Sequence, residues 1–161
     1  MPHPKLNGTI PAVGSEAPQL RFVLQDRSNS DLTSLRGQVV VLLSVPSLDT
    51  STCALETRKF NELAAGLGAQ VLLVSVDTPY AMKRFCVAEG IDNVRMGSDF
   101  RFHDLVRNWG VEIAEGGLQA ATARAVWVLD KQGVIQYHEL TAELGHEPNY
   151  EAALEAAKAL L

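Results

Sequence analysis

The sequence predicts an α/β fold in which helices cover both faces of a mixed central sheet. In the first half of the chain, apolar strand-like runs alternate with segments that have helical spacing. In the second half, two alternating runs are joined by a tight turn, and an amphipathic segment closes the chain. Strand, helix and strand in succession form a right-handed parallel crossover, whereas a tight turn joins antiparallel strands. The sheet is therefore expected to be mixed.

Composition limits the class of protein. A chain of 161 residues, 47% hydrophobic and 20% charged, suits a single domain over residues 1–161. A net charge of -5 without a basic cluster argues against a nucleic-acid partner. The longest apolar run, 39–45, is far shorter than the roughly 18 residues of a membrane span, and the first residues lack a secretory signal pattern. We expect a soluble, cytoplasmic protein that binds neither nucleic acid nor membrane.

The elements can be placed in order from periodicity and turn residues. Residues 1–18, rich in proline, should form a short extended N-terminal arm that lies over the domain. Short strands are expected at 20–24 and, weakly, 94–96, and buried strands at 39–45 and 71–76. Helices are expected from Ser51 to a stop at Gly66 or Gly68, and from Pro79 to Gly90. The remaining elements expected before the closing helix are a turn at 30–37, a short helix at 100–110, a loop at 116–121 and a hairpin over 123–140.

The closing helix is expected after Pro148. Asn149 is suited to cap its first turn, because its side chain can accept hydrogen bonds from free amides. By helical spacing, the side chains predicted to face the core are Tyr150, Leu154, Ala157 and Leu161.

Cys53 lies where the 39–45 strand gives way to a helix. Pro46 ends the strand, and a run of hydroxyl and carboxylate side chains then precedes the helix, so Cys53 falls in its first turn. The free amides and the positive end of the helix dipole favour an anion there, which eases ionisation of the thiol to the nucleophilic thiolate. The alternative is that Cys53 is a small buried hydrophobic residue.

A second cysteine, Cys86, lies on the predicted helix that begins at Pro79. Two cysteines are too few for a disulfide framework and lack the paired spacing of a zinc site, so the pair is either redox-active or incidental. The four histidines have no metal-type spacing and are interpreted as surface residues: His3, His103, His138 and His146. No metal site is predicted.

The order of elements is that of the thioredoxin-like fold, and its first strand-to-helix elbow is where that fold places its redox cysteines. The elbow PSLDTSTC fits the PxxxTxxC pattern of the peroxiredoxins, and with the following RKFN it resembles the thiol peroxidase subgroup, which contains atypical two-cysteine peroxiredoxins. Around Cys86, KRFCVAEGI resembles the segment that carries the resolving cysteine, and ATARAVWVLD resembles the one that carries the active-site arginine, here Arg124. Members usually begin with a fuller hairpin, for which this chain has only KLNGTIPAVG.

The resemblance implies a role for each matched residue. The Thr50 hydroxyl would bond to peroxide or to the thiolate; alternatively it is a plain helix cap. Pro46 would wall the pocket without competing for hydrogen bonds, although it also ends the strand. Arg124, a permanent cation in an apolar strand, would face the Cys53 thiolate; alternatively it pairs with Glu56 or Asp49, or is shared. Glu56, one turn after Cys53, would disfavour the thiolate unless an arginine neutralised it.

The mechanism implied by the resemblance reduces hydrogen peroxide and organic hydroperoxides through a sulfenic acid on Cys53. Cys86 would then form an intramolecular disulfide, which thioredoxin would reopen. No cofactor is implied, and similar proteins form homodimers. Two alternatives stay open from the sequence: a peroxide-sensing thiol relay, and a non-enzymatic thioredoxin-like binding module.

Overall fold

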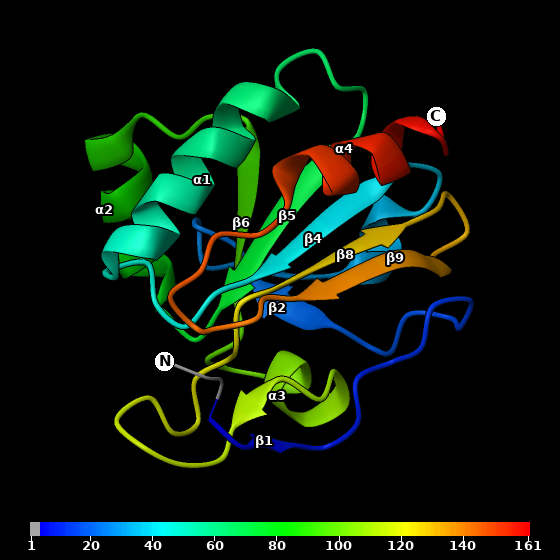
Figure 1. Cartoon of the computed structure of the whole chain (residues 1–161). Coiled ribbons are helices and arrows are strands. Elements are labelled where there is room, and N and C mark those ends of the chain that lie inside the picture. Colours follow the sequence, from blue (N-terminus) through cyan, green and yellow to red (C-terminus); the bar gives the residue numbers. More distant parts are fainter. Residues whose placement is uncertain (1–3) are drawn as a thin grey trace.

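A seven-stranded sheet forms the centre of the molecule (Figure 1), as seen in a computed structural model that describes residues 4–161. Its strands are β2 (Arg21–Val23), β3 (Asn29–Asp31), β4 (Val40–Ser44), β5 (Gln70–Ser75), β6 (Val94–Ser98), β8 (Ala125–Leu129) and β9 (Ile135–Leu140). Their order across the sheet is β3-β2-β6-β5-β4-β8-β9.

The sheet is mixed, as the sequence predicted. β4 pairs in parallel with β5, and β5 in parallel with β6, whereas the pairings β4–β8, β8–β9, β2–β3 and β2–β6 are antiparallel. Every residue of β4 is buried, because this strand has a neighbour on both edges and side chains packed on both faces. Because β4 and β5 are parallel, their carboxyl ends lie side by side at the same end of the sheet, where the cysteine elbow begins.

Helices cover both faces of the sheet. The helices α1 (Ser51–Ala64), α2 (Pro79–Glu89) and α4 (Tyr150–Lys158) lie on one face, above the sheet in Figure 1. The short helix α3 (Asp104–Asn108) and the N-terminal arm lie on the other face, and residues of the 3₁₀ helix Leu32–Leu35 pack there too. Alternate residues of the strands supply two hydrophobic clusters, one on each face. The predicted thioredoxin-like architecture is confirmed.

The predicted starts of α1 and α2 and the predicted end of α2 agree with the structure. α1 ends earlier than predicted, at Ala64 with Ala65 as its C-cap, and Gly66 lies beyond the cap in the left-handed region. Thr50 and Thr78 have extended backbones, and their side chains accept hydrogen bonds from the amides of Cys53 and Ala81, respectively. Gly90 ends α2 in the left-handed region, with φ of 67°. The prediction for α4 was partly wrong: Leu161 lies beyond the helix and is 53% exposed, and Ala153 with Ala157 provides the buried contact.

The N-terminal arm crosses the far face and pairs with a strand that the sequence did not indicate. β1 (Leu6–Asn7) pairs antiparallel with β7 (Glu112–Ile113), instead of forming a hairpin with its own neighbours. Gly110 permits the crossing, because a Cβ there would lie 2.3 Å from the backbone of Thr9. Residues 1–3, which include His3, lie outside the described residues. In residues 4–161, no helix combines the length and apolarity needed to cross a membrane.

Candidate active site

The loop between β4 and α1 is held in place by one carboxylate. Asp77 follows β5 and accepts hydrogen bonds from the Leu48 amide (3.0 Å) and the Ser47 hydroxyl (3.3 Å). The Ser75 hydroxyl donates to the same carboxylate at 2.6 Å. Because β4 and β5 are parallel neighbours, Asp77 fixes the loop after one strand to the end of the next. The first turn of α1 thereby has a defined position.

Cys53 occupies this first turn, as predicted, and is fully buried. Its amide donates to the Thr50 hydroxyl oxygen at 3.3 Å, and the Thr50 hydroxyl donates to the Ser47 carbonyl at 3.1 Å. Thr50 is therefore the cap of α1, which was the alternative interpretation of this residue. The cap also keeps the hydroxyl in the same turn as the thiol, so capping and a catalytic role are compatible.

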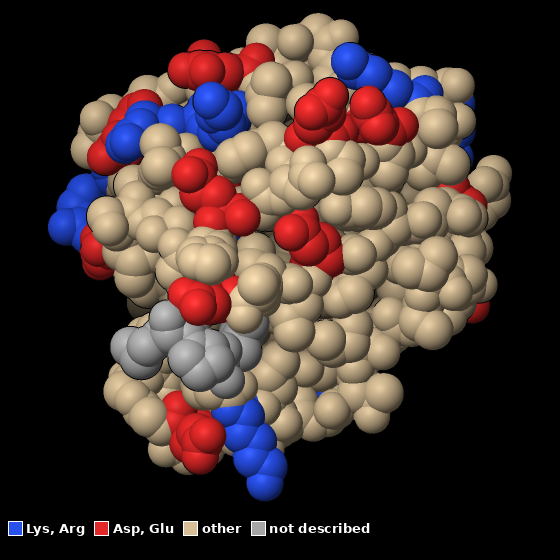
Figure 2. All heavy atoms as spheres, viewed as in Figure 1, with Lys and Arg blue, Asp and Glu red and all other residues tan. Residues whose placement is uncertain are grey.

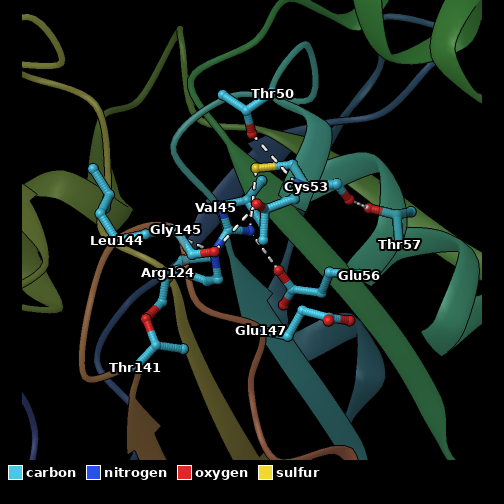
Figure 3. Close-up of polar contacts among 12 residues, drawn as sticks. Val45, Thr50, Cys53, Glu56, Thr57, Arg124, Thr141, Leu144, Gly145 and Glu147 are labelled. Atoms are coloured by element: carbon cyan, nitrogen blue, oxygen red, sulfur yellow. Dashed lines mark hydrogen bonds and ion pairs between the residues drawn. The ribbon is translucent and has the colours of Figure 1, made fainter. Parts of the chain in front are cut away.

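Arg124 connects Cys53 with a buried carboxylate (Figure 3). Its Nη1 donates to Cys53 Sγ at 3.2 Å and to Glu56 Oε2 at 2.6 Å. Its Nε donates to the Leu144 carbonyl at 3.0 Å, which fixes the plane of the guanidinium. Of the arrangements left open by the sequence, the structure has the shared one. Asp49 is not part of it, because its carboxylate lies 3.4 Å from Arg84.

Burial and charge act in opposite directions on the Cys53 thiol. Burial raises the pKa of Cys53, whereas Arg124, the Thr50 hydroxyl and a backbone hydrogen bond at Ser47 lower it. Burial is the larger effect, so the pKa is raised in this closed arrangement. The expectation that the thiol ionises more easily at the helix terminus is therefore wrong in the net direction. The groups that do lower the pKa of Cys53 are Arg124, the Thr50 hydroxyl and the backbone at Ser47.

Glu56 has a similar balance. Burial raises the pKa of Glu56 to about 7, against the opposing effect of the Arg124 charge. Among the described residues, its Oε1 has no hydrogen-bond partner. The guanidinium therefore faces two groups, a thiol and a carboxyl, whose charges depend on pH. A second negative charge near Arg124 weakens the attraction that the first one receives.

Open hollows lie on two sides of the elbow. A cavity of about 370 Å³ lies between the start of α1 and the second half of α2, with Thr50 and Phe85 in its lining. A cavity of about 510 Å³ lies on the side of Pro46 and is also lined by Phe100 and His103. Pro46 is buried and lines this cavity. Its role in shaping the peroxide pocket stays a prediction.

Cys86 lies on α2 and belongs to the same hydrophobic cluster as Cys53. Both residues are free thiols. The Cys86 sulfur accepts a hydrogen bond from Gln25 Nε2 at 3.3 Å. Burial raises the pKa of Cys86, and the Gln25 amide lowers it. The structure thus places Thr50 and Arg124 in contact with Cys53, with Pro46 at the elbow and Cys86 on the neighbouring helix.

The sequence did not identify Asp77 and Gln25 as site residues, and it identified Glu56 only as a possible partner of Arg124. Asp77 had an available signal, because it is a polar residue directly after a buried strand that is parallel to the elbow strand. Glu56 was recognised as a possible partner of Arg124, one turn after Cys53, but not as a member of the site. Gln25 had no signal, since 61 residues separate it from Cys86 in sequence.

A thioredoxin-like sheet with a buried cysteine at its first elbow and a guanidinium on the sulfur defines a thiol-dependent oxidoreductase. The described residues hold no group of three or more side chains of the kinds that bind metal ions.

Comparisons with known proteins give the family. The Redoxin family model matches residues 12–154. The thiol peroxidase of Leptospira interrogans is 47% identical over 160 residues, which is 98% of this chain and 94% of that protein. The thiol peroxidase of Mycobacterium tuberculosis is 46% identical over 92% of this chain and 90% of that protein. A crystal structure of a peroxiredoxin-like protein from Aquifex aeolicus superposes with a TM-score of 0.92 at 42% identity, covering 97% of this chain and 91% of that one.

The chain belongs to the Redoxin family and, within it, to the peroxiredoxins of the thiol peroxidase subgroup. It is accordingly an oxidoreductase enzyme, a peroxidase that depends on a thiol. The resemblance seen in the elbow motif is thereby confirmed over nearly the whole chain.

Proposed function

We propose that Cys53 is the peroxidatic nucleophile of a single catalytic domain spanning residues 1–161. The observation that carries this is the contact between Cys53 Sγ and Arg124 Nη1 at 3.2 Å, inside a site where the cation is itself buried. A buried permanent cation is costly without an anion, and the thiolate is the anion that peroxide reduction requires. Above a pH of about 7, Glu56 supplies the balancing charge while the thiol is neutral.

In the reaction, the Cys53 thiolate attacks the terminal oxygen of a hydroperoxide. An S–O bond forms, the O–O bond breaks, and the leaving oxygen takes a proton to give water or an alcohol. Sulfur is oxidised by two electrons to the sulfenic acid. Arg124 and the Thr50 hydroxyl lie close to the sulfur and would stabilise the charge that develops on the two oxygens. Pro46 contributes a wall without an amide donor.

Cys86 then acts as the resolving residue. Its sulfur attacks the sulfenic sulfur of Cys53, the S–S bond forms, and the oxygen leaves as water. Both residues lie in helices and are free thiols here, so we expect the first turn of α1 and the α2 segment to unwind locally when the disulfide forms. External dithiols reduce such disulfides, and we propose thioredoxin as the reductant.

The proposal extends to the substrates, the assembly and the location of the protein. Hydrogen peroxide and organic hydroperoxides are the proposed substrates, a homodimer is the proposed assembly, and the cytoplasm is the proposed location, because two unpaired thiols suit a reducing compartment. On the face drawn in Figure 2, acidic groups are spread over the surface, and Lys and Arg groups lie in separate places toward its margins. Together with the net charge of -5, this supports a protein partner rather than nucleic acid.

The deciding experiment is a thioredoxin-coupled peroxidase assay with hydrogen peroxide and an organic hydroperoxide. The wild-type protein should turn over at least one of them, and Cys53→Ser should be inactive, because serine supplies no thiolate near neutral pH. Residual activity above roughly a few per cent of wild type would remove Cys53 from its role.

Peptide mapping of the oxidised protein should then find a Cys53–Cys86 disulfide within one chain. Hydrogen exchange should be faster in the first turn of α1 and in α2 after oxidation. A disulfide found only between chains, or equal protection of both segments in the two redox states, would reject intramolecular resolution.

A further inference from the structure

The turn between β2 and β3 touches the helix that carries Cys86. Gln25, in this turn, donates a hydrogen bond from its side-chain amide to the Cys86 sulfur at 3.3 Å. Arg27, two residues further, places its guanidinium over the Tyr80 ring, 5.3 Å from the ring centroid. The turn therefore contacts α2 at two points, the first turn of the helix and the cysteine in its second half.

The turn is itself well fixed, so its contacts can restrain the helix. The Leu24 amide donates to the Ser28 carbonyl at 2.9 Å, and the Arg27 amide donates to the Leu24 carbonyl at 2.8 Å. The Ser28 amide and hydroxyl both donate to Asp26, at 2.9 Å and 2.5 Å. The residues before and after Gln25 are thus fixed by hydrogen bonds, so the backbone of Gln25 has a defined position.

The two sulfurs have donors from distant parts of the sheet. Gln25 follows β2 and Arg124 directly precedes β8, and these strands stand four positions apart in the order β2-β6-β5-β4-β8. At about 4.8 Å per strand, that is roughly 19 Å across the sheet. Both cysteines are free, and a cavity of about 370 Å³ lies between the first turn of α1 and the second half of α2. A disulfide requires S–S contact at about 2.0 Å. Cys86 therefore has to move toward Cys53, which breaks its hydrogen bond with Gln25.

A contact that exists before a step and is absent in its transition state slows that step. The Gln25 bond belongs to the folded, reduced arrangement of α2, and so does the Arg27 contact. We propose that Gln25 is a positioning residue that retains Cys86 in folded α2 and thereby prolongs the life of the Cys53 sulfenic acid. This inference rests on the proposed roles of the two cysteines.

The lifetime of the sulfenic acid decides between two reactions. Attack by Cys86 forms the disulfide and releases water. Attack by a second hydroperoxide on the sulfenic sulfur forms a second S–O bond, breaks the O–O bond and gives the sulfinic acid plus water or alcohol. Retention of Cys86 by Gln25 therefore makes the enzyme more sensitive to inactivation at high peroxide, and it leaves more time for a partner thiol to react.

Several charged side chains near these contacts form ion pairs or hydrogen bonds with other residues, so substitution of Gln25 tests the contact with Cys86 specifically. Arg84 of α2 bonds to Asp49, and Glu89 bonds to Arg58 at 2.6 Å. Asp26 of the turn accepts from Ser28. The hydrogen bond that the Cys86 sulfur receives thus comes from a neutral amide, whose removal changes no charge.

The test is rapid-mixing kinetics on Gln25→Leu with one equivalent of hydrogen peroxide, followed by mass spectrometry at rising peroxide. Formation of the sulfenic acid should stay within about twofold of wild type, because Gln25 does not touch Cys53. Disulfide formation should be roughly fivefold faster, the effect of losing one hydrogen bond of about 1 kcal/mol. The sulfinic acid fraction should fall. The exposed Gln38→Leu is the matched control and should change neither rate.

A second variant separates retention from general loosening. Arg27→Ala should also speed disulfide formation but leave the pKa of Cys86 unchanged, whereas Gln25→Leu should raise that pKa, measured in a Cys53→Ser background. Disulfide formation that is unchanged or slower in Gln25→Leu would overturn the proposal. Failure of the wild-type protein to form the disulfide would instead overturn the proposed function, so the two results are distinguishable.

Discussion

Cys53 and Cys86 are similarly buried, at 0% and 7% exposure, yet they have different surroundings. Cys53 lies in the first turn of α1, beside free helix amides and a guanidinium. Cys86 lies near the end of α2, where its carbonyl accepts from the amides of Gly90 and Ile91, and its sulfur meets a neutral amide. Burial therefore does not distinguish the two thiols, whereas the charge of the donor does.

This difference separates two chemical tasks. A cation held against Cys53 stabilises negative charge wherever it develops, on sulfur or on a peroxide oxygen. An amide against Cys86 gives a weaker bond that can be released at low cost. We therefore propose that the surroundings of Cys53 stabilise a transition state, whereas those of Cys86 let its thiol move.

Replacing Cys86 should have the largest effect, because it removes one of the two thiols that are compared. Cys86→Ser should oxidise at the wild-type rate, because Cys53 and its donors are unchanged, and then stall as a sulfenic acid after about one turnover. Dimedone labelling followed by mass spectrometry would show the adduct on Cys53. Sustained thioredoxin-dependent turnover in this variant would mean that Cys86 is not the resolving residue.

Removing the cation tests the Cys53 half of the comparison. Arg124→Ala should slow the oxidation step by a factor on the order of 10² to 10³, since a charged donor to the reacting sulfur is lost. Stopped-flow oxidation by hydrogen peroxide measures this directly. Arg101→Ala is a suitable control, because Arg101 is exposed and bonds to Asn29, away from the site. Equal rates in the two variants would assign Arg124 a purely structural role.

Two threonines with the same capping role allow a sharper test. Thr50 caps α1 and Thr78 caps α2, so Thr50→Val and Thr78→Val should each lower the free energy of unfolding by about 1 kcal/mol. Only Thr50→Val should slow oxidation, by a factor on the order of 10², because only Thr50 lies beside Cys53. Urea titration and stopped-flow kinetics would separate the effects. A neutral Thr50→Val in the kinetic measurement would leave Thr50 as a cap alone.

Glu56 should have the smallest kinetic effect and a distinct pH dependence. As pH rises through about 7, Glu56 ionises and competes with Cys53 for Arg124. Glu56→Gln removes this competition, so its oxidation rate near pH 8 should exceed that of wild type by roughly three- to tenfold. Near pH 5, where Glu56 is protonated, the two rates should converge. A constant ratio at all pH values would exclude titration of Glu56 as the cause.

The same substitution should change stability in a defined direction. Folding raises the pKa of Glu56 above its ordinary value of 4.5 to about 7, so the native state binds the proton more tightly. That stability is present below pH 4.5 and is lost as pH rises through about 7. The wild-type protein should therefore lose more free energy of unfolding between these limits than Glu56→Gln, as measured by urea denaturation.

Local patterns carried most of the fold and the centre of the site. The signals for buried strands, helix caps and the glycine stop at Gly90 each come from residues that are close together in the sequence. The elbow motif likewise places Thr50 and Cys53 three residues apart. The missing parts depend on contacts between distant segments. Gln25 meets Cys86 only because β2 lies beside β6, and the net direction of the pKa of Cys53 depends on how completely the folded chain excludes water.

The pairing of β1 with β7 has a consequence for synthesis of the chain. Asn7 donates to the Glu112 carboxylate at 2.7 Å across a separation of 105 residues. At a synthesis rate of about 5–20 residues per second, the arm is made on the order of ten seconds before its partner strand β7. Leu6 and Ile10, which pack against the far-face cluster, are without that contact during this time. The arm is thus made well before its partner strand but docks late, and the crossover β4–α1–β5 that positions Cys53 can form before the arm docks.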